Sequence, residues 1–261
     1  MKIHILYFAI LFVFSNFSVA QEINNTSFAG GEKLTYIASF YMSSLWTDLA
    51  EINMEVSDIT TKTQELYRLK CVASTYQAWD SYFKIRDLYE SYVDKKTVKP
   101  YLFKRSVDEG GYILNIKYVY KWKSQMVNAT IQKRTNPEKV QEVKILPNTY
   151  DLVSVLYMIR NIDYSAKKPG DLMRINVLID AKVEVVTVKY RGTETINVAG
   201  MGNKLCYKLS VALKDDSILK GKDLNNIWLT ADKNKIPALI KAEIPVGSVQ
   251  IRLSNSSGLR N

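Results

Sequence analysis

Histidine is almost absent from this sequence of 261 residues, whose one imidazole belongs to His4. His4 lies in a leader that we predict to be removed, so the mature chain would carry no imidazole. Without histidine, neither a Ser-His-Asp nor a Cys-His nucleophilic site can be built. The commonest protein ligand of catalytic zinc is missing as well. The sequence therefore excludes the most widespread types of hydrolase site.

Cysteine is scarce too, with only Cys71 and Cys206. Two cysteines are too few for a structural zinc site. In an extended chain, Cys71 alternates in phase with apolar Leu69, whereas Cys206 alternates in phase with Lys204 and Lys208. Because alternate side chains of a strand face opposite sides, the thiols should point apart. We predict two unpaired cysteines, no metal and no cofactor.

Sequence motifs of catalysis are missing as well. There is no G-x-S-x-G elbow, H-E-x-x-H pair, phosphate-binding P-loop or complete G-x-G-x-x-G fingerprint. Gly200-Met201-Gly202 has half of that fingerprint but lies between two extended runs, which is typical of a hairpin turn. Histidine-free hydrolases can be assembled from a Ser–Lys pair or two distant carboxylates, so that alternative stays open. The sequence favours a protein that is not an enzyme.

The first twenty residues have the order of a secretory signal peptide. Lys2 supplies the charge, residues 5–14 are an unbroken apolar run, and Ser18-Val19-Ala20 offers the small-x-small cleavage pattern. Ten apolar residues are too few for a spanning helix, which needs about twenty. We therefore predict cleavage near Ala20, a periplasmic or secreted protein, and no transmembrane segment in the mature chain.

The chain is basic, with 36 lysines and arginines against 26 acids. Only Lys2 lies in the leader, so 35 basic residues remain and the mature formal charge is +9. The basic residues are dispersed and form no dense block. An exported protein meets few nucleic acids, so we expect no nucleic-acid partner and a solvated basic surface.

Period-two alternation dominates the mature chain, beginning with Leu34, Tyr36, Ala38 and Phe40 on one side of a strand. Such alternation, rich in Val, Ile, Thr and Tyr, is typical of half-buried strands. The further extended runs are 47–57, 65–76, 81–94, 100–107, 111–121, 126–133, 172–179, 182–190, 193–199, 204–213, 226–230, 236–244 and 247–253. Short turns join them, which predicts an all-β fold: a mainly antiparallel meander, barrel-like or folded into two packed curved sheets.

One segment departs from this pattern. After Pro147, Thr149 can cap a helix and Asp151 would lie in its first turn. Apolar residues then recur with helical spacing at Leu152, Val155, Leu156 and Ile159. We predict one helix at about 149–161 within a single domain, 21–261. It separates an N-terminal strand group, about 31–146, from a C-terminal one, about 170–254.

Several local patterns carry a family resemblance. They are Gly31-Glu32-Lys33-Leu34-Thr35-Tyr36, Ile85-Arg86-Asp87, the segment 151–160 and Ile227-Trp228-Leu229-Thr230-Ala231-Asp232. In this order and spacing the chain resembles the exported bacterial domain-of-unknown-function family numbered 3108, over nearly the whole mature length. The resemblance implies a β-rich protein of the cell envelope with no assigned activity and no catalytic residues to transfer.

Charged and aromatic residues beside the predicted apolar faces supply the candidate binding site. A charge there can form an internal ion pair that fixes the helix on the sheet, or it can line the mouth of a ligand cavity. Aromatic residues gather between Tyr76 and Tyr92, where a β-core or a concave ligand-binding sheet would place them. The candidate binding residues are Arg86, Asp87, Tyr157, Arg160 and Trp228.

These observations favour a non-enzymatic binding or assembly-support protein of the envelope. Its ligand would be amphiphilic or glycan-like, a lipid or glycan of the envelope, held between the curved sheet and the helix at 149–161. A periplasmic scaffold that binds an envelope protein is the alternative. An outer-membrane barrel is disfavoured because Arg68 and Lys70 would put charge in the middle of a lipid-facing strand.

Overall fold

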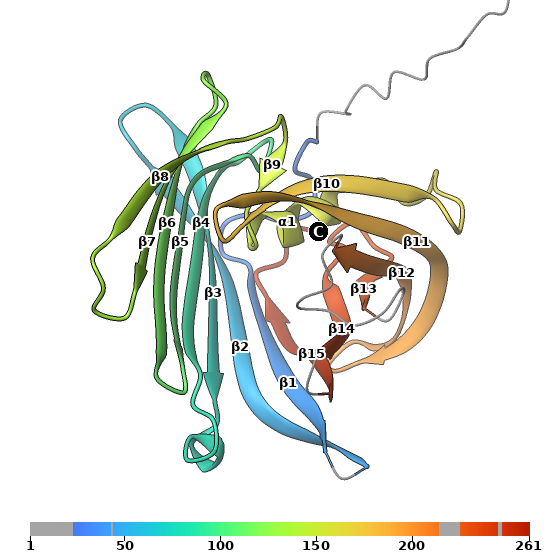
Figure 1. Ribbon diagram of the computed structural model, residues 1–261. Coiled ribbons are helices and arrows are strands. Elements are labelled where there is room, and N and C mark those ends of the chain that lie inside the picture. The colour runs from blue at the N-terminus through green and yellow to red at the C-terminus, as the bar shows by residue number, and fades with distance from the viewer. Residues whose placement is uncertain (1–22, 43, 214–224, 245–246) are drawn as a thin grey trace, which may run out of the picture.

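The structure is a computed structural model that describes residues 23–42, 44–213, 225–244 and 247–261. The predicted signal peptide lies outside these residues. The described chain forms one sheet of 15 strands with a short helical segment (Figure 1). The strands are β1 Lys33–Met42, β2 Leu45–Thr60, β3 Glu65–Thr75, β4 Arg86–Asp94, β5 Pro100–Glu109, β6 Tyr112–Lys121, β7 Met126–Lys133, β8 Lys139–Lys144, β9 Thr149–Tyr150, β10 Leu172–Ile179, β11 Lys182–Val198, β12 Gly202–Leu213, β13 Asn226–Thr230, β14 Pro237–Ile244 and β15 Gly247–Ser257.

The sheet is a meander in which the first strand and the last strand of the chain pair with each other in the middle of the strand order. Its order runs β8 to β1, then β15 down to β9, so that β1 pairs with both β2 and β15. All pairs are antiparallel except the short parallel pair of β9 and β10. The arm of β3–β8 and the arm of β10–β15 curve toward each other, so the sheet has a concave inner face (Figure 1). This confirms the predicted all-β antiparallel fold, as one curved, barrel-like sheet with β8 and β9 at its edges.

The concave face of the sheet forms the core. In β6, Leu114, Ile116, Tyr118 and Tyr120 are buried, while the alternating Lys117, Val119 and Lys121 are exposed. This is the alternation read from the sequence, and it assigns the apolar side to the inside of the shell. The alternation therefore fixes which side chains lie on the concave face.

Two predicted strands, 182–190 and 193–199, are one long bent strand, β11. Its register with β12 shifts between Tyr190 and Thr193. Gly192, at φ +97°, occupies the break. A bulge bends a strand and increases its twist, and a glycine adopts this backbone without a side-chain clash. The bend curves the second arm around the concave face.

The helical segment is shorter than predicted and begins later. It consists of α1, Ser154–Met158, and the 3₁₀ turn η2, Ile159–Asn161. Thr149 does not cap it: its hydroxyl donates to Leu146 O (2.7 Å), and the residue belongs to β9. Asp151 takes the capping role, because its Oδ1 accepts hydrogen bonds from the backbone N–H of residues 153 (2.9 Å) and 154 (2.8 Å).

Aromatic packing fixes α1 at one end of the shell, between the two arms (Figure 1). Tyr157 is buried, and its ring meets that of Phe28 edge-on at 4.7 Å between centroids. Phe28 in turn lies 5.8 Å from the ring of Tyr67 on β3. This end of the shell is therefore filled by side chains.

Both cysteines are free, as predicted. Cys71 lies on the inner face of β3, beside Leu69. Cys206 is fully buried, although its neighbours in the alternation are lysines.

Candidate binding cavity

An apolar cavity lies at the end of the shell opposite α1, where the β1–β2 turn and the 3₁₀ turn η1, Gln77–Trp79, are found (Figure 1). Its volume is about 590 Å³. We call it the mouth pocket. It is lined by Ala38, Ser39, Phe40, Met42, Leu49, Ala50, Thr75, Trp79, Tyr82, Phe83, Ile85 and Val249.

Most polar groups of the mouth pocket are already engaged with the protein. The Ser39 hydroxyl donates to Asp48 Oδ1 (2.7 Å), and the Thr75 hydroxyl donates to Asp80 Oδ1 (2.5 Å). The indole N–H of Trp79 donates to Asp48 O (3.0 Å). A ligand group in this pocket therefore meets mainly carbon, and a polar group there would lose hydrogen bonds to water without replacing them.

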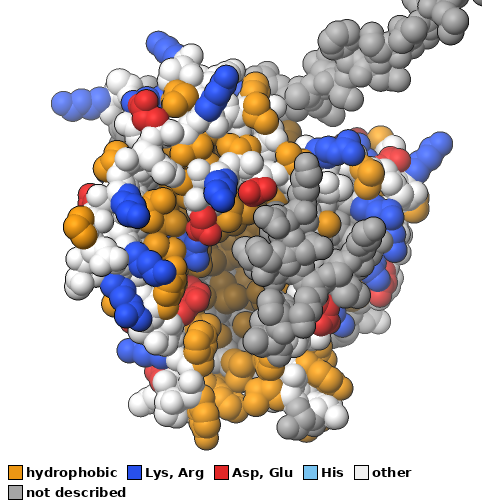
Figure 2. Space-filling view, viewed as in Figure 1, with side chains coloured by type: hydrophobic (Ala, Val, Ile, Leu, Met, Phe, Trp, Pro, Cys, Tyr) orange, Lys and Arg blue, Asp and Glu red, His pale blue; other side chains and the backbone are white. Residues whose placement is uncertain are grey.

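Large hydrophobic side chains surround this opening and are exposed, an arrangement that commonly marks an interaction or ligand site. Figure 2 shows a hollow with largely hydrophobic walls between the arms and hydrophobic side chains gathered at its lower end. These rim residues come from the β1–β2 hairpin and from the loop after η1: Met42, its cross-strand partner Leu45, Tyr82 and Phe83.

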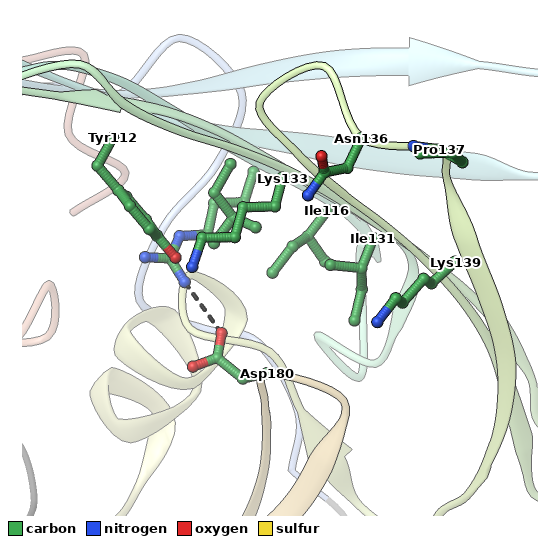
Figure 3. A pocket seen from close by; sticks show the side chains of 10 residues that line it. Tyr112, Ile116, Ile131, Lys133, Asn136, Pro137, Lys139 and Asp180 are labelled. Atoms are coloured by element: carbon green, nitrogen blue, oxygen red, sulfur yellow. Dashed lines mark hydrogen bonds and ion pairs between the residues drawn. The ribbon is translucent and has the colours of Figure 1, made fainter.

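A second cavity, of about 340 Å³, lies near the edge strand β8, where the shell is not closed (Figure 3). We call it the seam pocket. The inner faces of β5–β8 and the β10–β11 turn line it, with Arg105, Tyr112, Leu114, Ile116, Ile131, Lys133, Asn136, Pro137, Lys139 and Asp180. Its floor is apolar, and three of its side chains are cationic.

The β10–β11 turn closes one side of the seam pocket. Asp180 and Ala181 both have positive φ, +46° and +59°, as a two-residue hairpin turn requires. The backbone N–H of Ala181 donates to the hydroxyl of Tyr118 (2.9 Å). Arg105 Nη1 donates to Asp180 Oδ1 (3.2 Å). These two bonds join the two arms of the sheet across the hollow.

A buried carboxyl, that of Asp87, lies near both pockets. Asp87 is only 6% exposed and accepts hydrogen bonds from the Tyr89 hydroxyl and from Asp108 N, both 3.3 Å long. Burial, and then the neighbouring Glu109 carboxylate, raise the pKa of Asp87. Asp87 therefore holds a proton more readily than an exposed aspartate does.

Of the five candidate residues, Arg86 and Asp87 lie nearest the mouth. Arg86 is adjacent to the mouth-pocket residue Ile85, and its Nη2 donates to Asp80 Oδ2 (2.5 Å) while Nη1 donates to the Thr75 hydroxyl (3.0 Å). It thereby holds the η1 loop against the sheet. A contact of Arg86 or Asp87 with a ligand remains a prediction.

Tyr157 and Arg160 are packed into the core at the opposite end, each 1% exposed. Arg160 donates to both carboxylate oxygens of Glu32 (2.6 and 2.7 Å) and, through Nε, to Asn234 O (3.1 Å). The pair joins the helical segment to the chain before β1. A smaller cavity of about 240 Å³ lies beside the helix, lined in part by Met158.

Trp228 is buried in β13, with its indole N–H donating to Glu194 Oε2 (3.1 Å). Lys208 Nζ lies 4.9 Å from the centre of its ring. These contacts satisfy the polar atom of the indole, and a ligand contact of Trp228 remains a prediction.

Several pocket residues escaped the sequence analysis. The aromatic residues between Tyr76 and Tyr92 did point to the η1 loop, which contributes Trp79 and Phe83 to the mouth pocket. Lys133 and Lys139 gave no signal, because lysines at strand ends and turns are ordinary surface residues. Only the curvature of the sheet brings them to face Asp180.

The family described as "Protein of unknown function (DUF3108)" matches residues 35–254. The chain belongs to this family. The DUF3108 chain is also similar in fold to a solved structure from Brucella abortus, titled as a beta-barrel-like protein of the domain of unknown function DUF1849. The identity is 12%, the TM-score is 0.58, and the similarity covers 87% of the DUF3108 chain and 96% of the other. At this identity the likeness shows the fold alone. The curated proteins include no match to the DUF3108 chain.

Two further features of the DUF3108 structure concern metals and membranes. Among its described residues, no group of three or more His, Cys, Asp or Glu side chains is placed to hold a metal ion. In that same part of the chain, no helix is long and apolar enough to cross a bilayer.

Proposed function

We propose that this protein is exported and, in the periplasm or outside the cell, binds an amphiphilic molecule whose apolar chain occupies the mouth pocket. The observation that carries the proposal is an open cavity of about 590 Å³ whose hydroxyl and indole groups at Ser39, Thr75 and Trp79 already have protein partners. Its volume lies within the range of about 300–1,000 Å³ typical of ligand pockets.

An alkyl chain fits this lining better than a sugar does. A sugar face needs hydrogen-bond partners for its hydroxyls, and the mouth pocket supplies few that are free. An alkyl chain needs none, and each buried methylene contributes about 0.8 kcal/mol. Eight methylenes would therefore contribute about 6 kcal/mol before the cost of ordering the ligand. The exposed rim gives such a chain an apolar path to the pocket.

Isothermal titration of the mature protein with decyl glucoside, below its micelle concentration, tests the binding. We expect saturable 1:1 binding, weakened at least about tenfold by Phe83→Ser, because Phe83 lines the pocket yet is 52% exposed and so is not needed for folding. Leu205→Ser is the matched control, since Leu205 is 53% exposed and lies on β12. Absence of binding, or equal loss in both variants, would refute the proposal.

Two measurements in cells complete the test. N-terminal sequencing of the protein recovered from the envelope fraction should begin at Gln21. Native mass spectrometry of the same material should show a bound mass of alkyl-chain character. An unprocessed N-terminus in the cytoplasm would contradict export.

A further inference from the structure

We infer that the seam pocket binds the acidic group of this amphiphile, so that the ligand is an anionic amphiphile carrying a carboxylate or a phosphate. The inference rests on the proposed function and names the class of its ligand.

The first argument is charge. Arg105 on β5, Lys133 on β7 and Lys139 at the start of β8 face the same cavity, and Asp180 is the one acid among its lining residues. Figure 3 shows Lys133 and Lys139 extending into the space that Asp180 faces. Three cations therefore line the cavity with one acid, and the cavity favours an anion.

The second argument is an unmet hydrogen-bond donor. Arg105 Nε is buried and has no hydrogen-bond partner among the described residues. The guanidinium is held in place by Asp180 on one side (3.2 Å) and by the ring of Tyr89, 5.5 Å from its central carbon, on the other. A fixed guanidinium with a spare donor suits an oxyanion, since charge-assisted bonds to carboxylate or phosphate are roughly twice as strong as neutral ones.

The third argument is that the two pockets are neighbours. Ile85 of the mouth pocket is bridged to Glu109, and Glu109 pairs with Tyr112 of the seam pocket. Neighbouring strands lie about 4.8 Å apart, so Ile85 and Tyr112 are about 10 Å apart. The ring of Phe83 also lies against Gly110, in the turn before Tyr112. One molecule can place its chain in the mouth pocket and its acid in the seam pocket.

The experiment compares three probes with the same ten-carbon chain, each titrated calorimetrically into the mature protein below its micelle concentration: decanoate, decyl phosphate and neutral decyl glucoside. We expect at least one acid to bind at least about tenfold more tightly than the glucoside at low salt, and the preference to shrink as salt is added. The double variant K133Q/K139Q should lose the preference and keep the affinity for the glucoside. The control K62Q/K117Q removes the same charge from exposed residues outside the pocket and should change neither.

The outcomes separate this inference from the proposed function. If the glucoside and both acids bind equally to the wild-type protein, the inference fails while the mouth pocket stands. If no probe binds, the proposed function itself fails. If K62Q/K117Q lowers the preference as much as K133Q/K139Q, the effect is one of net charge and the seam pocket is not the site. Inorganic phosphate binding alone as tightly as decyl phosphate would make the pocket a free-anion site and overturn the assignment to an amphiphile.

Discussion

At the scale of single residues, the contact between Arg160 and Glu32 decides how the helical segment is held. Both side chains are buried, and the guanidinium meets both carboxylate oxygens. Two charges removed from water are tolerated only when each is paired and hydrogen-bonded. Here Asn234 O accepts from Arg160 Nε, and Ser27 Oγ donates to Arg160 O (2.7 Å). The pair thus joins three separate segments of chain.

Replacing Glu32 by Gln should destabilise the protein by about 3–5 kcal/mol, because it leaves the Arg160 charge buried without a counter-charge. Urea unfolding followed by circular dichroism measures the change. Glu142→Gln is the control: its contact with Lys121 is long (3.4 Å) and exposed, and such pairs contribute about 0–1 kcal/mol. A loss below 1 kcal/mol for Glu32→Gln would show that the pair does not hold the helix.

Asp151 should make stability depend on pH in an unusual direction. It is fully buried, and burial raises its pKa from 3.8 to about 6, although Ser91 Oγ donates to it (2.6 Å). The folded state therefore holds this proton more tightly than the unfolded chain does. Its contribution to stability is complete below about pH 4 and is lost as the pH rises through 6.

The variant Asp151→Asn should remove this pH dependence, because an amide does not titrate. Its oxygen can still accept the two backbone hydrogen bonds, so the helix start is kept. As the pH rises from 4 to 6, the wild-type protein should lose free energy of unfolding relative to the variant. The loss should reach up to about 3 kcal/mol for a pKa change of about two. Urea titrations at four pH values between 4 and 7 provide the measurement. Parallel pH profiles for the two proteins would contradict it.

The sequence predicted residue roles only where the signal was local. It left open whether Arg160 would form an internal ion pair or line a ligand cavity, and it gave no sign that Glu32, 128 positions earlier, would be its partner. The aromatic residues before Tyr92 were compatible with a β-core and with a concave ligand-binding sheet, and the sequence did not decide between the two. The cations of the seam pocket could not be found this way, because their common direction depends on the curvature of four strands.

At the scale of elements, alternation predicted most strands and failed where it carries no information. β8, Lys139–Lys144, is an edge strand with almost every residue exposed. A strand exposed on both faces has no apolar period, so its sequence resembles a loop.

The helix start was misplaced for another reason. Both Thr149 and Asp151 suit a cap, and the parallel pairing of Thr149 with Asn176, far along the chain, decides between them.

The junction between the end of β15 and the start of β1 gives an element-scale prediction. Gly258 and Gly200 both have left-handed φ, +65° and +71°. A Cβ at 258 would lie 2.1 Å from the backbone oxygen of Gly31, whereas one at 200 would meet nothing within 4 Å. Gly200→Ala should cost about 1–2 kcal/mol from backbone strain alone, and Gly258→Ala clearly more. Equal losses in urea unfolding would mean that the chain at 258 shifts without penalty.

At the scale of the whole molecule, the sequence predicted an antiparallel meander but not its closure. Nothing local in β1 or β15 shows that they pair with each other, since the pairing depends on complementary faces and a shared bulge near Thr35. That pairing joins the two arms. The edge strands β8 and β9 are not paired with each other, and the gap between them is the open side of the sheet. The two pockets therefore follow from how the sheet closes, not from any motif.

Removing β15 should abolish the fold, because β15 pairs with both β1 and β14. A chain ending at residue 246 should show no cooperative urea transition and little near-ultraviolet circular dichroism. A chain ending at residue 258 keeps the strand and loses only terminal contacts such as that of Arg260 with Asn25 O, so it should unfold cooperatively. Cooperative unfolding of the shorter chain would show that the arms are stable without their junction.

The pairing of β1 with β15 also determines when, during synthesis, the sheet can be completed. Ser39 of β1 is made 213 positions before Arg252, to which it is hydrogen-bonded across the junction. At about 5–20 residues per second, the ribosome needs about 10–40 s to bridge that interval. During this time β1, at the edge of the nascent first arm, lacks its partner β15, and the apolar inner face of that arm is uncovered. The first arm therefore cannot complete its edge until β15 has been made.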